Sequence, residues 1–334
     1  MIPAQDAPRL WLRGAPVGAQ LGANGSSADD ASGHAAAIMA IINRTDDSFY
    51  AAARSLDDSA ALRAAETALA DGAQIVDIGG VRAGVGPVIT QDEEIRRVVP
   101  FVRLVRERFP ELLISVDTWR SGVAREVAAA GADLINDTWA GHDPELVHVA
   151  GEFGIGVVCS HTGNMVPRTD PFRVTYIGAH DHDGGSSLSD GQLALRGDRA
   201  ALPGILDDVL ATLQGAADRA VAAGVDPRSV LVDPTHDFGK NTWHSLQLMR
   251  HTSKLVELGF PVLMALSRKD FVGETLDLAP EDRLEGTLAA TAVAAWEGAQ
   301  VFRAHDVRAT RRVLDMVAAM RGELAPKRVT RAVD

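Results

Sequence analysis

The chain has 334 residues, of which 46% are hydrophobic and 23% charged, a balance typical of globular proteins with a large core. A formal net charge of −12 argues against a broad interface with nucleic acid or an anionic membrane, although a small basic pocket could still bind an anionic substrate. The single cysteine, Cys159, excludes an intrachain disulfide, and no apolar run is long enough to span a bilayer. These features predict a cytoplasmic protein without nucleic-acid or membrane partners.

The amino-terminal region lacks a structural pattern. Residues 1–36 are rich in Ala, Gly, Ser and Pro, and the segment 21–30 has neither helical nor strand periodicity. We expect a flexible leader over residues 1–36.

From Ile38 onward, short apolar runs alternate with segments of helical length. The runs show no polar alternation, which is typical of strands buried on both faces of a parallel sheet. In chain order the pattern predicts strand 38–42 with helix 59–70, strand 75–78 with helix 93–109, strand 112–116 with helix 122–130, strand 133–135 with helix 144–153, strand 155–159 with helix 204–223, strand 230–232 with helix 242–258, strand 262–266 with helix 281–297, and strand 300–303 with helix 307–320.

Eight such pairs predict an α/β fold that closes as a TIM (β/α)8 barrel over residues 37–322, with a C-terminal tail at 323–334. An open doubly wound sheet is the alternative. The interruption at about 160–203 is too long for an ordinary connection. A solvated loop is favoured there over a metal site at His180, Asp181, His182 and Asp183, because nothing nearby would hold the ligands rigid.

Polar residues follow several of the predicted strands. Asp117, Asn136 and Asp233 stand at strand ends, where each alone could shape a turn or cap a helix. The strand ends of a barrel share one rim, so together these side chains could surround a flat heterocycle with hydrogen-bond donors and acceptors. The sequence therefore predicts a ligand site at the carboxyl-terminal rim.

Basic residues follow the last two predicted strands. Lys269 could donate a hydrogen bond to a ring carbonyl or a carboxylate. Arg303 and His305 follow the final strand, on the side where this fold often binds phosphate, and could hold an anion.

Seven motifs stand along the chain in this order: Ile38 to Asn43 (I-M-A-I-I-N) with Thr45 and Asp47 to Phe49, Asp77 to Gly80 (D-I-G-G), Ser115 to Thr118 (S-V-D-T), Ile135 to Asp137 (I-N-D), Asp233-Pro234 with Phe238 to Lys240 (F-G-K), Ser267 to Lys269 (S-R-K), and Arg303 with His305 and Asp306. Their order and spacing resemble dihydropteroate synthase from Ile38 to about Met320. The resemblance implies a TIM barrel, usually dimeric, that condenses 6-hydroxymethyl-7,8-dihydropterin diphosphate with p-aminobenzoate in folate biosynthesis.

The resemblance also implies roles for individual residues, with Mg²⁺ as cofactor. The residues that match the family's pterin-binding positions are Asp117, Asn136, Asp233 and Lys269, of which Asp233 and Lys269 are the expected catalytic pair. The diphosphate-binding positions are matched by Asn43, Arg303 and His305, with Asn43 as the expected metal ligand. Mg²⁺ and Arg303 would stabilise the departing diphosphate.

The departures from the family pattern cluster in the loops. The family's N-V-T-P-D-S-F-S-D-G-G becomes N-R-T-D-D-S-F-Y-A-A-A at 43–53, and its G-G-E-S-T-R-P-G becomes G-G-V-R-A-G-V-G at 79–86. The family's G-I-G becomes Thr235-His236-Asp237, which we expect to add bulk and charge to the floor of the site, and Asp270 replaces a serine, where we expect it to repel the aminobenzoate carboxylate.

These changes indicate a divergent second copy of the enzyme, of the actinobacterial type, with weak synthase activity. An inactive paralogue that keeps a pterin and anion pocket is the alternative. A methyltetrahydrofolate-using methyltransferase is disfavoured because such enzymes do not need the S-R-K and R-x-H anion motifs.

Overall fold

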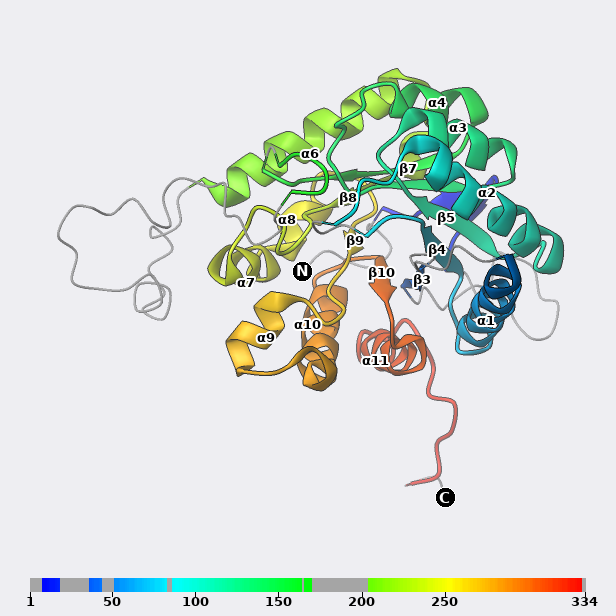
Figure 1. Ribbon diagram of the computed structural model, residues 1–334. Coiled ribbons are helices and arrows are strands. Elements are labelled where there is room, and N and C mark those ends of the chain that lie inside the picture. Colours follow the sequence, from blue (N-terminus) through cyan, green and yellow to red (C-terminus); the bar gives the residue numbers. More distant parts are fainter. Residues whose placement is uncertain are drawn as a thin grey trace.

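The computed structural model describes residues 8–18, 36–43, 51–82, 86–163, 165–169 and 204–331. Its centre is a parallel sheet of eight strands in the order β8-β7-β6-β5-β4-β3-β10-β9. A parallel bridge between Val232 and Val262 joins the two edge strands, so the sheet closes and the helices lie outside it (Figure 1). The strands are β3 (Ala37–Asn43), β4 (Ile75–Gly79), β5 (Leu113–Asp117), β6 (Leu134–Asp137), β7 (Gly156–Ser160), β8 (Val230–Asp233), β9 (Leu263–Met264) and β10 (Val301–Ala304). The predicted TIM barrel is confirmed, and the open sheet is not observed.

The barrel strands are mostly apolar on both faces because each face is covered. In β3, Ile38 and Ala40 pack against the surrounding helices, whereas Ala37 and Met39 point into the barrel. The inward cluster also contains side chains from the other strands, among them Ile75, which fill the interior by contact across the barrel. This two-sided burial explains the uninterrupted apolar runs of the sequence.

The helices follow the predicted order, with two differences. The predicted helix 242–258 is broken at His251, whose φ of −118° is not helical. A short helix that was not predicted, Asp270–Leu276, lies between β9 and the helix predicted at 281–297. The helices are α1 (Ala51–Ala70), α2 (Gln91–Arg108), α3 (Ser121–Ala129), α4 (Leu146–Phe153), α6 (Ile205–Ala222), α7 (Thr242–Arg250), α8 (Thr252–Val256), α9 (Asp270–Leu276), α10 (Leu284–Trp296) and α11 (Val307–Met320). The central part of the predicted insertion, with the metal site considered at 180–183, lies outside the described residues.

A β-hairpin closes the amino-terminal end of the barrel. It consists of β1 (Trp11–Leu12) and β2 (Ala15–Pro16), and it places Leu10 and Leu12, 2% and 3% exposed, in the inward cluster. Ser229, just before β8, donates a hydrogen bond of 2.6 Å to the Trp11 carbonyl. Residues 8–18 therefore differ from the flexible leader predicted over 1–36, because two leucines one residue apart fill the open end of the barrel. Residues 1–7 and 19–35 lie outside the described part.

Replacing Leu12 by Ala is expected to destabilise the fold by about 2–5 kcal/mol, since the side chain is buried and a cavity would remain. Urea unfolding followed by circular dichroism measures this change. The control is Leu69→Ala on α1, where the same truncation occurs at a side chain that is 43% exposed and within a helix that favours Ala. Equal losses in the two variants would show that the hairpin does not contribute to the core.

No helix among the described residues is both long enough and apolar enough to cross a membrane.

Candidate functional site

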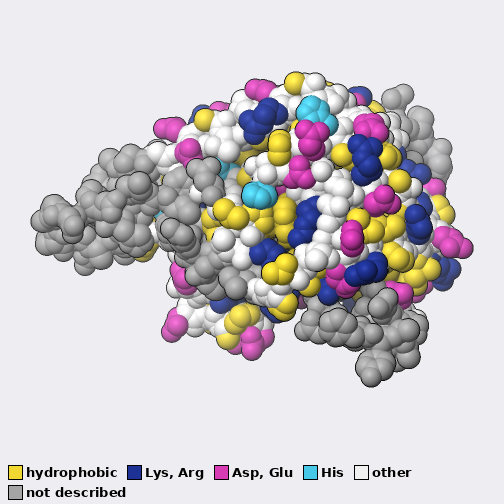
Figure 2. Space-filling view, turned by 45° about the horizontal axis from the view of Figure 1, so that its top comes forward, with side chains coloured by type: hydrophobic (Ala, Val, Ile, Leu, Met, Phe, Trp, Pro, Cys, Tyr) yellow, Lys and Arg dark blue, Asp and Glu magenta, His cyan; other side chains and the backbone are white. Residues whose placement is uncertain are grey.

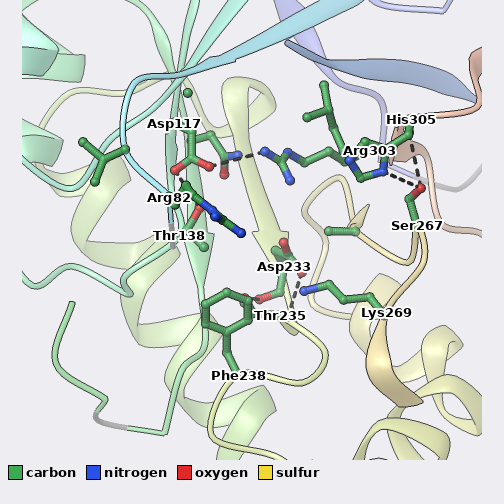
Figure 3. Close-up of a pocket in the computed structure, with 15 residues that line it drawn as sticks. Arg82, Asp117, Thr138, Asp233, Thr235, Phe238, Ser267, Lys269, Arg303 and His305 are labelled. Atoms are coloured by element: carbon green, nitrogen blue, oxygen red, sulfur yellow. Dashed lines mark hydrogen bonds and ion pairs between the residues drawn. The ribbon is translucent and has the colours of Figure 1, made fainter. Parts of the chain in front are cut away.

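A cavity of about 340 Å³ lies at the carboxyl-terminal rim of the barrel. Figure 3 shows side chains from strands distant in sequence pointing into it. Six of the seven predicted site residues line it: Asp117, Asn136, Asp233, Lys269, Arg303 and His305. The seventh, Asn43, ends β3 and pairs with Gly79 of β4 at the same rim, but its side chain is not part of the description. The convergence predicted from the sequence is therefore observed for six residues.

A buried carboxylate that the sequence did not assign to the site lies under the cavity. Asp77 of β4 is fully buried, and Asn136 donates to its Oδ2 from 3.0 Å. Arg303 donates through Nε to the same oxygen at 2.6 Å, and Ser115 donates to Oδ1 at 2.6 Å. The sequence could have indicated Asp77, because it is a single carboxylate inside an otherwise apolar strand and a buried charge needs a partner.

Asp117 lies between a cation and a hydroxyl. Its Oδ2 accepts a hydrogen bond from Arg303 Nη2 at 3.3 Å and its Oδ1 accepts one from Thr138 at 3.0 Å. Burial, with the neighbouring charge of Asp77, raises the pKa of Asp117 to about 7 despite Arg303. The charge of Asp117 therefore changes near neutral pH.

Asp233 and Lys269 lie next to each other on the floor of the cavity (Figure 3). Asp233 Oδ1 accepts from the Thr235 N–H at 2.7 Å, and burial raises the pKa of its carboxyl against the charge of Lys269. Lys269 donates to the His236 carbonyl at 3.1 Å, and its Nζ lies 4.6 Å from the centre of the Phe238 ring. Burial lowers the pKa of Lys269. The cavity floor thus offers a hydrogen-bond acceptor, Asp233, beside a hydrogen-bond donor, Lys269. This pair suits a ligand that has both hydrogen-bond donors and acceptors.

The opposite end of the cavity is suited to an anion. Arg303 supplies a guanidinium, and His305 is held by Ser267, whose Oγ lies 2.9 Å from Nδ1 and accepts the His305 N–H at 3.3 Å. In a neutral ring, if the Ser267 hydroxyl donates to Nδ1, the proton of the ring is on Nε2; the direction of this hydrogen bond depends on the tautomer. Burial and the charge of Arg303 lower the pKa of His305, in keeping with a neutral donor.

The expected crowding of the floor by Thr235-His236-Asp237 is not observed for two of the three residues. Thr235 and Asp237 have φ of +49° and +71°, so this turn keeps a backbone that favours glycine. Thr235 lines the cavity, whereas Asp237 turns away and accepts the Asp270 N–H at 2.6 Å, at the start of α9. His236 is buried against Phe271, and burial lowers its pKa to about 3. The added charge caps α9, which explains this unpredicted helix.

The turn is fastened from below by Lys240. Its buried ammonium donates to the carbonyls of His161 at 2.7 Å, Phe238 at 3.0 Å and Thr235 at 3.1 Å. Burial lowers the pKa of Lys240 to about 7. The shape of the floor therefore depends on a lysine that does not line the cavity.

The expectation for Asp270 is corrected as well. Arg283 Nη1 donates to its carboxylate at 2.7 Å, and Asp270 is not among the residues that line the cavity. Its charge is therefore compensated before it could repel a bound carboxylate.

An aromatic cluster lies beside the cavity, which two of its members, Val81 and Phe238, line. The Trp139 ring meets Trp119 and Phe238 edge to face, with centroids 6.3 Å and 5.6 Å away. Val81, the residue after Gly79-Gly80, packs into this cluster, and Arg82 lines the cavity. The polar segment that follows Gly-Gly in the family is thus replaced at its first position by an apolar contact. Residues 44–50 and 83–85, where most loop changes fall, are outside the description.

No group of three His, Cys, Asp or Glu side chains in the described ranges is arranged to hold a metal ion. A magnesium ion that arrives with a diphosphate would take most of its ligands from phosphate oxygens and water, so the oxygen of one rim amide would suffice from the protein.

Comparison with known proteins places the chain in a family. A model of the pterin binding enzyme family matches residues 39–305. A Mycobacterium leprae protein named inactive dihydropteroate synthase 2 is 53% identical over 296 residues, covering 89% of this chain and 94% of the relative. Dihydropteroate synthase of Bacillus subtilis is 34% identical over 285 residues, 85% and 88% of the two chains. The structure of Yersinia pestis dihydropteroate synthase with a sulfonamide drug matches with a TM-score of 0.73 at 30% identity, covering 94% of this chain and 99% of that one. These matches confirm the resemblance that the motifs indicate, and the chain belongs to the dihydropteroate synthase family of pterin-binding enzymes.

Proposed function

We propose that the protein binds 6-hydroxymethyl-7,8-dihydropterin diphosphate in the rim cavity and has little or no synthase activity with p-aminobenzoate. The observation that carries the proposal is that one cavity brings together Asp117, Asn136, Asp233 and Lys269 but is lined by Val81 at the position where the family has a glutamate. The name of the Mycobacterium leprae relative, inactive dihydropteroate synthase 2, supports the second half.

The floor supplies partners for a 2-amino-4-oxo heterocycle. Asp233 would accept from the 2-amino group and ring N–H, while Lys269 would donate to the 4-oxo group. Arg303 and His305 would hold the diphosphate, which leaves as charge develops on its bridging oxygen when the carbon–oxygen bond breaks. Asp233 would also stabilise the cationic pterin that remains, and Lys269 would stabilise the charge on the ring oxygen.

The second half-reaction lacks its usual support. An arylamine must enter over the mouth, and closing loops normally complete such a site and exclude water. Here Val81 packs into the aromatic cluster in place of the family's glutamate, and the family's Ser-Thr is absent from 82–83. Binding without efficient transfer is the expected result.

Mg²⁺ would enter as the counter-ion of the diphosphate, with Asn43 as its protein ligand at the end of β3. It would neutralise charge on the leaving group. The protein would act in the cytoplasm, and Figure 2 shows charges of both signs interspersed on the face presented, without one broad basic patch. A homodimer would use α10 and α11, which expose Val293, Met316 and Met320.

Two measurements test this function. The diphosphate with Mg²⁺, at about 100 times its Kd, is expected to raise the unfolding midpoint by several degrees. A ligand that binds only the folded state stabilises it by about 2.7 kcal/mol at this concentration. Repeating the measurement with EDTA should reduce the shift, and no shift in either condition would refute binding. In a synthase-deficient strain, the gene is expected to support little or no growth without added folate products. Growth equal to that given by an active synthase would refute the loss of transfer activity.

A further inference from the structure

Lys240 gathers three backbone carbonyls at a point outside the cavity. Its side chain is 4% exposed, and its ammonium donates to the carbonyl oxygens of His161, Phe238 and Thr235 at 2.7, 3.0 and 3.1 Å. An ammonium group has three N–H donors, so these carbonyls use all of them. His161 follows β7, whereas Thr235 and Phe238 belong to the turn after β8. Lys240 therefore ties this turn, residues 235–238, to the neighbouring strand.

The turn after β8 has a backbone that needs support. Thr235 and Asp237 have φ of +49° and +71°, a region that costs energy for residues other than glycine. Strained backbone persists only where the surrounding structure holds it. Removal of the ammonium would take a donor away from three buried carbonyls at once. The turn is then expected to relax.

Two cavity-lining side chains take their positions from this turn (Figure 3). The Thr235 N–H donates to Asp233 Oδ1 at 2.7 Å and so fixes one oxygen of the carboxylate. The His236 carbonyl accepts a hydrogen bond from Lys269 Nζ at 3.1 Å, and the centre of the Phe238 ring lies 4.6 Å from the same nitrogen. The turn thus holds the acceptor and the donor of the floor beside each other.

The anion end of the cavity has other supports. Arg303 is held by Asp77 and Asp117, and His305 is held by Ser267. None of these contacts involves the turn or Lys240. A relaxed turn is therefore expected to change one end of the cavity and to leave the other as it is.

We propose that Lys240 is a positioning residue that, by holding the turn, sets Asp233 and Lys269 at the spacing a pterin ring requires, without contact with the ring itself. The inference rests on the proposed function, since it assumes that a pterin occupies the floor. Its consequence is a separation that a loss of overall stability does not produce. Removal of the ammonium weakens binding of the ring and leaves binding of a diphosphate group intact.

The test measures the Kd values of two fragments, 6-hydroxymethyl-7,8-dihydropterin and inorganic pyrophosphate with Mg²⁺, by anaerobic calorimetry on the full chain at pH 6. Lys240 carries its proton at this pH, since burial lowers its pKa to about 7. In Lys240→Met the ring fragment is expected to bind at least about tenfold more weakly, whereas the Kd of pyrophosphate stays within about twofold of the wild type.

Two further variants separate positioning from stability. Leu12→Ala destabilises the amino-terminal end of the barrel, away from the cavity, so both fragments should bind its folded form within about twofold of the wild type. Lys240→Gln introduces a side chain as long as that of Met but with two N–H donors. It should therefore recover at least about threefold of the ring affinity that Lys240→Met loses.

An unchanged ring affinity in Lys240→Met, or equal losses for the two fragments, would overturn the role of Lys240. The same holds if Lys240→Gln binds the ring no better than Lys240→Met does. If Lys240→Met does not fold, the comparison of the two fragments in Lys240→Gln decides. Failure of the wild type to bind the ring fragment would instead overturn the proposed function.

Discussion

Asp233→Ala is expected to weaken the binding of the dihydropterin diphosphate at least about 100-fold, or about 2.7 kcal/mol. The carboxylate is buried at the floor, and its removal would delete charge-assisted hydrogen bonds to the ring and leave Lys269 without one of its anionic neighbours. The Thr235 N–H would also lose its acceptor. Calorimetric titration of the ligand with Mg²⁺ gives the Kd.

Asp270→Ala provides a matched control for this loss. It also removes a carboxylate close to Lys269, but Asp270 is paired with Arg283 and does not line the cavity. Its affinity should stay within about threefold of the wild type, less than about 0.7 kcal/mol. Similar losses in both variants would mean that general charge around Lys269, and not the Asp233 contact, holds the pterin.

Arg303→Met is expected to have the largest effect on stability, a loss of about 3–5 kcal/mol at pH 8. The guanidinium contacts both Asp77 and Asp117, and its removal would leave two buried carboxylates without their cation. Diphosphate binding should be lost as well. Urea unfolding between pH 5 and pH 8 measures the stability term.

The pH dependence of this variant follows from the carboxylates. Burial and the charge of Asp77 already raise the pKa of folded Asp117 to about 7, above its unfolded value of about 3.9. Because folded Asp117 binds its proton more tightly than unfolded Asp117, protonation stabilises the folded state as pH falls below about 7, and this stabilisation is lost as pH rises through that value. Without Arg303 the pKa rises further, so the deficit of Arg303→Met should shrink toward pH 5. The control is Arg308→Met, whose pair with Asp71 is exposed, and a deficit independent of pH would contradict the electrostatic cause.

The sequence predicted those features that depend on neighbours along the chain. Strand and helix order followed from the apolar runs, and Asp117, Asn136 and Asp233 were found because a polar residue ends each of their strands. Asp77 was missed as a site residue because its partners, up to 226 residues away, decide whether a carboxylate inside a strand is functional.

The errors have the same origin. Asp237 and Asp270 were read as charges on the floor, but their direction depends on the N-terminus of α9 and on Arg283, which the sequence does not place beside them. The hairpin around Leu12 was missed because a pattern of two leucines is too short to predict burial. Their burial depends on the side chains of the barrel interior against which they pack.

The hairpin also bears on the order in which the protein assembles. Trp11 is joined to Ser229 across 218 residues of chain, so the hairpin can complete its contacts only after the much later segment around Ser229 has been synthesised. Until β8 has been synthesised, the leucines of the hairpin and the underside of the nascent sheet stay exposed to solvent and to chaperones. A bulky amino-terminal fusion would prolong that interval, whereas a carboxyl-terminal one would leave docking of the hairpin unhindered.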